Sequence, residues 1–90
     1  MPIRMITGIN TVYTHEGIDY HLQVEDLGRE AAVFEIRIYN QGTVVWQKRM
    51  SYADLEEQNL PKGEHDLALR AKMKKTLHTV EAAIAKGKIS

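Results

Sequence analysis

Residues 18–25, Ile-Asp-Tyr-His-Leu-Gln-Val-Glu, decide the fold, because apolar and polar side chains alternate along the whole stretch. A half-buried β-strand has this side-chain period of two. The expected inward residues are Ile18, Tyr20, Leu22 and Val24, and the expected outward residues are Asp19, His21, Gln23 and Glu25. Residues 32–39 repeat the alternation, and residues 43–50 follow it more loosely. The sequence therefore predicts an antiparallel sheet with one apolar face.

The turn between the last two strands follows from their faces. The expected inward residues are Phe34, Ile36, Ile38, Val44, Trp46 and Met50, and the outward ones are Glu35, Arg37, Tyr39, Val45, Gln47 and Arg49. Directly opposed residues of an antiparallel pair share a face. A two-residue loop would place inward Ile36 opposite outward Gln47. A three-residue loop, Asn40–Gly42, instead pairs Ile38 with Val44, so we expect that loop, with its glycine in the left-handed region.

A similar glycine-ended turn, Thr14–Ile18, implies a strand before it at about residues 9–14. In that strand Val12 and Tyr13 compete for the inward position. The polar connection Asp26–Glu30 makes the next two strands neighbours, so the chain predicts a four-stranded antiparallel meander. The apolar residues Ile3, Met5, Ile6 and Ile9 leave three options open: a further strand, a segment exchanged with a second copy, or a segment folded back on its own sheet.

The hydrophobic period changes after residue 50. Ser51 and Asp54 resemble a capping box that opens a short helix to about Gln58, and residues 59–63 break it. A long helix ending near Gly87 is then predicted from apolar residues spaced by three and four. These residues are Leu69, Met73, Leu77, Val80 and Ile84. The expected fold is a single α+β domain over residues 1–90, with the long helix packed on one face of the sheet.

Composition excludes several classes of protein. The chain has no cysteine, which removes disulfides and thiolate metal ligands. It has no apolar run near the roughly 20 residues of a membrane span and no secretory pattern at its start, so we expect a cytoplasmic protein. Residues 1–60 hold five basic and nine acidic residues, whereas residues 61–90 hold seven basic and three acidic ones. The acidic body and basic end would attract each other or steer a charged partner.

Signatures of catalysis are missing from the sequence. Ser51 is better explained as a helix cap than as a nucleophile, and no phosphate loop, dinucleotide fingerprint or nucleophile elbow occurs. No two histidines have metal-ligand spacing. We therefore expect no enzyme and no cofactor. The alternative is a metal or enzymatic site across the first hairpin, formed by His15, Glu16, His21 and Glu25.

The basic C-terminal helix is a candidate nucleic-acid element. Its cations fall on both flanks of the apolar stripe, with Arg70, Lys74 and Lys88 on one flank and Lys72, Lys75 and Lys86 on the other. Lysines whose aliphatic stems cover the edge of a core have this placement. The pattern favours an ordinary amphipathic helix, and nucleic-acid binding is kept as an alternative.

Two short motifs resemble a group of small uncharacterised bacterial proteins. They are Tyr20-His21-x-Gln23-x-Glu25-Asp26-x-Gly28 and, after the glycine hairpin at Gly42, Lys48-x-x-Ser51-Tyr52. The resemblance covers about residues 12–55. It implies a bacterial cytosolic protein and carries no assigned activity, so it transfers no catalytic residue.

Protein contact is the leading functional expectation, because one long helix covers only one face of a four-stranded sheet. The exposed face would bind a second copy of the chain or another protein. Its candidate partner-binding residues are His21, Gln23, Glu25, Arg37, Tyr39 and Gln47.

Overall fold

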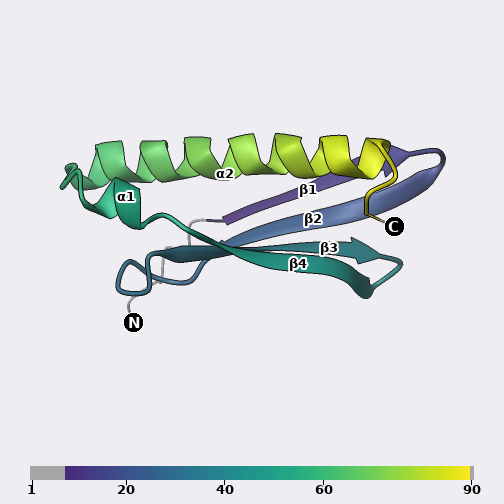
Figure 1. Ribbon diagram of the computed structural model, residues 1–90, viewed down its shortest axis with the longest axis horizontal. Coiled ribbons are helices and arrows are strands. Elements are labelled where there is room, and N and C mark those ends of the chain that lie inside the picture. The colour runs from purple at the N-terminus through teal and green to yellow at the C-terminus, as the bar shows by residue number, and fades with distance from the viewer. Residues whose placement is uncertain (1–7, 90) are drawn as a thin grey trace.

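The computed structural model describes residues 8–89, which form a sheet and a helical layer on one of its faces (Figure 1). The strands are β1 (Gly8–His15), β2 (Ile18–Asp26), β3 (Val33–Asn40) and β4 (Thr43–Ser51), and the helices are α1 (Ala53–Glu56) and α2 (Lys62–Ala85). The strands are antiparallel neighbours in chain order, β1-β2-β3-β4. The predicted α+β fold, a four-stranded meander with a short and a long helix, is confirmed. The expectation about residues 3–6 lies outside the described residues.

The core lies between the inward face of the sheet and the apolar stripe of α2. On the sheet side Leu22, Phe34, Ile36 and Ile38 are completely buried. The stripe residues predicted from helical spacing are all buried, from Leu69 to Ile84. Both sets follow from the local periods of the sequence, because each element must bury its apolar side against the other.

The register of the first hairpin decides which of two residues faces inward. A two-residue turn joins β1 and β2, so that His15 pairs with Ile18 and Tyr13 pairs with Tyr20. Tyr20 is buried, and Tyr13 packs against the core. Val12 therefore points to the opposite face, where it is 50% exposed.

The predicted three-residue loop between β3 and β4 is wrong. Asn40 pairs with Thr43, so the loop contains only Gln41 and Gly42, with φ of 52° and 81°. Positive φ at both central residues is the type I′ geometry, whose twist matches that of the flanking strands. The left-handed glycine is confirmed, whereas the loop length is not.

A β-bulge is the reason for this difference. The register shifts between Ile38 and Tyr39, which pair with Trp46 and Val44, so Val45 is the extra residue. After a two-residue loop, a regular ladder would pair inward residues of β3 with outward residues of β4. The extra residue shifts the register by one, so inward Ile38 pairs with inward Trp46. The predicted faces of the two valines are consequently wrong: Val44 is exposed on the far face, and Val45 packs against the core.

The predicted capping box is also wrong. The residue before α1 is Tyr52, so Ser51 lies one position too early to cap the helix. The Ser51 hydroxyl oxygen accepts a hydrogen bond from the Ala53 N–H at 3.2 Å, and the Asp54 carboxylate lies 3.6 Å from the Lys72 ammonium instead of turning back. The predicted interruption between the two helices is confirmed, and Asn59 in it has a φ of 50°.

The long helix begins earlier than the sequence suggested. α2 starts at Lys62, inside residues 59–63 that were expected to separate the two helices, so His65 lies in its first turn and is buried. The helix ends as predicted before Gly87, which has a φ of 74°. The Lys88 N–H donates to the Ala83 carbonyl at 2.9 Å, a Schellman-type closure. Within residues 8–89, no helix combines the length and the apolar character that crossing a bilayer requires.

The turn geometry predicts opposite effects for two substitutions. Gly42→Val should destabilise the protein by about 1–3 kcal/mol, because a β-branched residue is forced to positive φ. Gln41→Asn should raise the free energy of unfolding, since Asn-Gly is the preferred type I′ pair. Urea unfolding measures both, with exposed Thr43→Val as the matched control. A Gln41→Asn variant no more stable than the wild type would contradict the type I′ turn.

Candidate functional site

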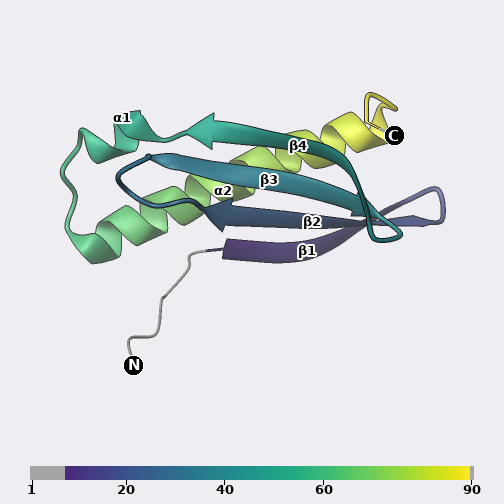
Figure 2. The same ribbon diagram turned by 90° about the horizontal axis from the view of Figure 1, so that it is seen from below.

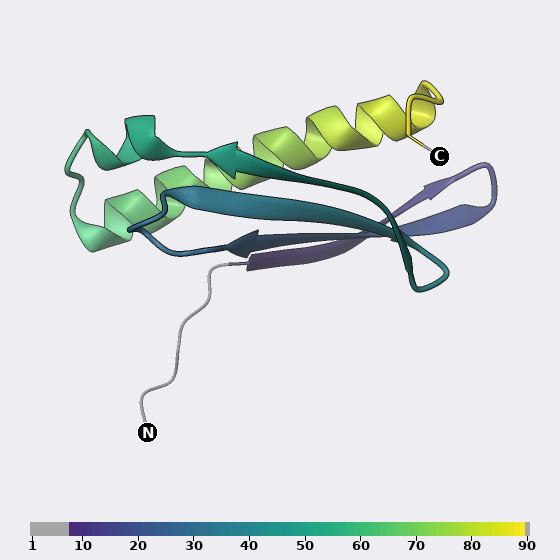
Figure 3. The ribbon, with the colours of Figure 1, turned by 60° about the horizontal axis from the view of Figure 1, so that its bottom comes forward.

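The sheet face opposite α2, called the outer face below, is the candidate binding surface. Figure 2 and Figure 3 show this face turned toward the viewer, with α2 behind the strands and no helix in front of them. All six side chains predicted from the sequence lie on it. They are His21, Gln23, Glu25, Arg37, Tyr39 and Gln47, at alternate positions of β2, β3 and β4.

The strand registers arrange the outer face into three rows that cross the sheet. The carboxamide row contains Asn10, Gln23, Arg37 and Gln47. The apolar row contains Val12, His21, Tyr39 and Val44. The charged row contains Glu25, Glu35 and Arg49, with Gly8 at its β1 end. Each row joins residues from all four strands, so no segment of the sequence contains a complete row.

The charged row holds a buried carboxylate on an otherwise open face. Glu35 is only 5% exposed, although it lies on the face of the sheet opposite α2. It forms an ion pair with Arg37, two residues along β3, and its other carboxylate oxygen accepts a hydrogen bond from the Arg49 guanidinium at 3.1 Å. Glu25 lies directly opposite Glu35 on β2, so the two arginines offset a like-charge pair. The sequence placed Glu35 and Arg49 outward but did not predict this cluster, since their pairing depends on the β3–β4 register.

The outer face shares two features with protein contact surfaces: arginine in place of lysine and exposed apolar side chains. Its cations are Arg37 and Arg49, and among the described strands no lysine lies at an outward position. Val12 and Val44, at the two ends of the apolar row, are 50% and 43% exposed. Between them Tyr39 is half-buried. Protein interfaces are enriched in tyrosine and arginine and depleted in lysine.

An open hollow on this face lies where the carboxamide and charged rows meet. Asn10, Gln23, Glu25 and Arg37 line it. Two carboxamides offer donors and acceptors together, the carboxylate accepts, and the guanidinium donates. Such a set can bind polar groups of a ligand or a peptide backbone, but it brings no nucleophile and base together.

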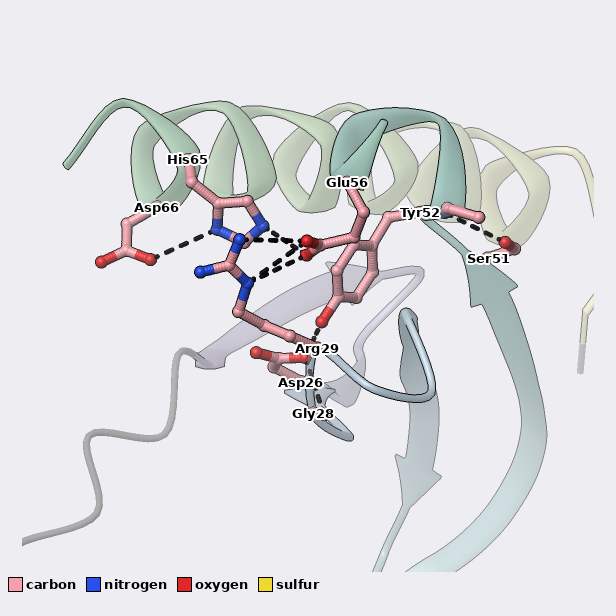
Figure 4. A network of polar contacts seen from close by, with 9 residues as sticks. Asp26, Gly28, Arg29, Ser51, Tyr52, Glu56, His65 and Asp66 are labelled. Atoms are coloured by element: carbon pink, nitrogen blue, oxygen red, sulfur yellow. Dashed lines mark hydrogen bonds and ion pairs between the residues drawn. The ribbon is translucent and has the colours of Figure 1, made fainter. Parts of the chain in front are cut away.

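A second polar cluster lies where the β2–β3 connection, α1 and the start of α2 meet (Figure 4). The Tyr52 hydroxyl donates a hydrogen bond of 2.6 Å to Asp26, and the same carboxylate oxygen accepts the Gly28 N–H at 3.0 Å. Tyr52 is fully buried, and its ring stacks near that of Phe34. Burial, followed by the hydrogen bond to the Asp26 carboxylate, raises the pKa of Tyr52 far above its ordinary value.

Glu56 is the centre of the same cluster. The Arg29 guanidinium donates to both of its carboxylate oxygens at 3.0–3.3 Å. The Nε2 atom of buried His65 lies 2.6 Å from Oε1 of Glu56, and its Nδ1 atom lies 3.6 Å from the Asp66 carboxylate. The hydrogen bonds from Arg29 lower the pKa of Glu56, and His65 adds to this effect while desolvation opposes it.

This cluster connects three segments of the chain, so its role is to stabilise their packing. Arg29 belongs to the β2–β3 connection, Glu56 to α1 and His65 to α2. The sequence did not predict these contacts, because residues 27 and 9 positions apart are joined by tertiary packing and share no periodicity. The signal in the sequence is that His65 lies four residues before Leu69, on the same side of the helix as the apolar stripe.

The alternative metal site near the first hairpin is not assembled, because its two histidines do not lie close together. His15 and His21 lie on opposite faces of the sheet, since His15 pairs with Ile18 and His21 with Val12. The His15 ring stacks on Tyr13, with ring centroids 6.4 Å apart. Within residues 8–89 no group of three potential ligands is close enough to hold a metal ion.

Two of the cations on α2 already have partners within the protein. The Arg70 guanidinium donates to the Gly8 carbonyl at 3.3 Å, and the Lys72 ammonium lies 3.6 Å from Asp54. Lys74 and Lys75 are exposed. These two contacts, with β1 and with α1, are consistent with the interpretation of α2 as an ordinary amphipathic helix.

Comparisons with protein-family models, with curated proteins and with solved structures find no match to this chain.

Removal of the Tyr52 hydroxyl should weaken the second cluster. Tyr52→Phe keeps the buried ring but removes the donor to Asp26, so the free energy of unfolding should fall by about 1–3 kcal/mol. Because the pKa of Tyr52 is raised, the hydroxyl contribution is complete below the ordinary tyrosine pKa of about 10 and is lost as the pH rises above it. Denaturant unfolding at several pH values checks this. Tyr13→Phe is the control, because the Tyr13 hydroxyl has no such carboxylate contact. An equal loss of unfolding free energy in both variants would contradict a stabilising Tyr52–Asp26 hydrogen bond.

Glu56 predicts an acid-dependent contribution to stability. Its pKa is lowered in the folded protein, so its contribution is complete above the unfolded pKa of about 4.3 and is lost as the pH falls through the lower folded value. Glu56→Gln should therefore be less stable than the wild type at pH 7, and the gap should close on acidification. The measurement is urea unfolding from pH 7 to pH 3, with exposed Glu57→Gln as control. A gap independent of pH would show that the Glu56 charge contributes nothing.

Proposed function

We propose that this chain is a protein-interaction domain that binds another protein through the outer face. The observation that carries the proposal is a sheet face that no helix of residues 8–89 covers, and whose apolar row has exposed Val12 and Val44 on either side of Tyr39. Three apolar or aromatic side chains, from β1, β3 and β4, lie in one row with His21 of β2, and such a row favours desolvation by a partner. The same face lacks the lysines that the protein carries at exposed helix positions.

The charged row lowers the cost of covering this face. Glu35 is already neutralised by Arg37 and Arg49, so a partner would not have to desolvate an isolated carboxylate. The pairs also hold the arginine side chains in place, which reduces the conformational entropy lost on binding. These contacts support a surface that is organised before its partner arrives.

The partner that fits this surface is a protein with an apolar centre and neighbouring peptide or carboxamide groups. The apolar centre would lie on the Val12–Val44 row, and the polar groups would bond to the carboxamide row. A nucleic acid fits less well, because acidic Asp19, Glu25 and Glu35 outnumber the two arginines on this face. The resemblance over residues 12–55 adds the expectation that the interaction takes place in a bacterial cytosol.

Photo-crosslinking from two positions tests the proposal. A photoreactive phenylalanine analogue at Tyr39 probes the outer face, and the same analogue at exposed His78 on α2 is the matched control. After irradiation in nuclease-treated lysate of the source organism, we expect a discrete protein adduct from position 39 and none from position 78. The adduct should disappear when Val12→Asp is added and persist when Ala71→Asp, an exposed helix change, is added instead.

Three results would overturn the proposal. They are no adduct at position 39, equal adducts at both positions, and an adduct that Val12→Asp leaves unchanged. An adduct that appears only without nuclease treatment would assign the outer face to nucleic acid. Circular dichroism of each variant confirms that the fold is retained.

A further inference from the structure

β1 is an edge strand with an open side. It pairs with β2 through all eight of its residues, and no other strand lies beside it in residues 8–89 (Figure 2). Asn10, Val12 and Thr14 are exposed along it. An unpaired strand edge presents free backbone donors and acceptors to any second strand.

The two edges of the sheet differ in how they are protected. β4, at the other edge, has the bulge at Val45 and the charged residues Lys48 and Arg49. Both features block strand addition in natural sheets. β1 has no bulge, no proline and no Asp, Glu, Lys or Arg. Among residues 8–89, the β4 edge is therefore protected against strand addition and the β1 edge is not.

The register identifies which backbone groups of β1 are free. A two-residue hairpin loop is flanked by a hydrogen-bonded pair, here His15 and Ile18. Hydrogen bonds to β2 then fall on the odd-numbered residues of β1. The even-numbered residues direct their N–H and C=O groups to the open edge; they are Gly8, Asn10, Val12 and Thr14. The Gly8 carbonyl agrees with this assignment, because it accepts a hydrogen bond from Arg70 of α2, which leaves the groups of Asn10, Val12 and Thr14 for a second strand.

We propose that a second copy of this chain occupies this edge, through antiparallel pairing of β1 with β1 of the other copy about a two-fold axis. A strand without ionised Asp, Glu, Lys or Arg side chains meets no charge repulsion when it pairs with itself. With Thr11 on the axis, Ile9 lies opposite Tyr13 of the other copy, an apolar pair that continues the core face. The product is a continuous eight-stranded sheet. This inference uses the strand edge and is independent of the function proposed for the outer face.

Charge complementarity at the two ends of β1 supports a second copy as the occupant. Arg70 lies at the Gly8 end, where it contacts the strand. Glu16 and Asp19 lie at the turn end, and the Glu16 side chain is 83% exposed. Antiparallel pairing brings Arg70 of each copy toward the Glu16 turn of the other, so the same attraction occurs twice in one dimer, although Glu25 lies opposite Gly8 at the same end.

A proline at an open-edge position tests the pairing. Asn10→Pro removes an N–H that points away from β2, so the hairpin keeps its bonds while strand addition is blocked. In sedimentation experiments over a range of concentrations, we expect a dimer for the wild type and at least a tenfold weaker dimer for Asn10→Pro. Asn10→Ala, which loses the outer-face side chain but keeps the N–H, should dimerise like the wild type. This control separates the edge from the outer face.

A cysteine at the axis provides a second measurement, which does not depend on a proline in the strand. The chain has no cysteine of its own, so Thr11→Cys introduces a unique thiol. Paired thiols at a two-fold axis should form a disulfide-linked dimer under mild oxidation, whereas Asn59→Cys, in an exposed loop away from β1, should form no disulfide between copies. A monomeric wild type together with no disulfide at position 11 would overturn the proposal. A chain that dimerises only after residues 1–7 are removed would assign the edge to that segment and also overturn it.

Discussion

The structure depends on one constraint: a single amphipathic helix has one narrow apolar stripe and can cover only one face of a sheet. The stripe of α2 buries the inward side chains of the strands, including Leu22 and Phe34, and this burial supplies the core of the protein. The opposite face receives no cover from α2, and at the β1 edge the Arg70 side chain of α2 contacts the Gly8 carbonyl. The polar features of the protein are best understood as consequences of this one-sided architecture.

The outer face remains stable without cover because its charges are paired within the sheet. Glu35 would be a buried, isolated carboxylate if Arg37 and Arg49 did not lie beside it. The second cluster has a different role at the end of the molecule. There Arg29, Glu56 and His65 join the β2–β3 connection to both helices, which keeps the first turn of α2 against the sheet. The Glu35 cluster thus organises the outer face, and the Glu56 cluster holds the helices against the opposite face.

The predictions that failed all concern irregular geometry. An unbroken ladder would require a three-residue loop, but the bulge at Val45 allows a two-residue loop and still keeps Ile38 opposite an inward residue. The capping box failed because the helix begins one residue later than Ser51 requires. A bulge or a helix boundary shifts by one residue at small energetic cost, and residue types alone do not distinguish these alternatives.

By itself, the sequence determined the strands, the inward face of each central strand, the α2 stripe and the outward position of all six candidate residues. These features follow from periods of two and 3.6, which are local properties of the chain. Only the tertiary structure decided the rows of the outer face, the pairing of Glu35 with two arginines and the contacts of His65 with Glu56. Those contacts depend on register and on packing between segments far apart in the chain. A one-residue change in register would alter them without changing any local pattern.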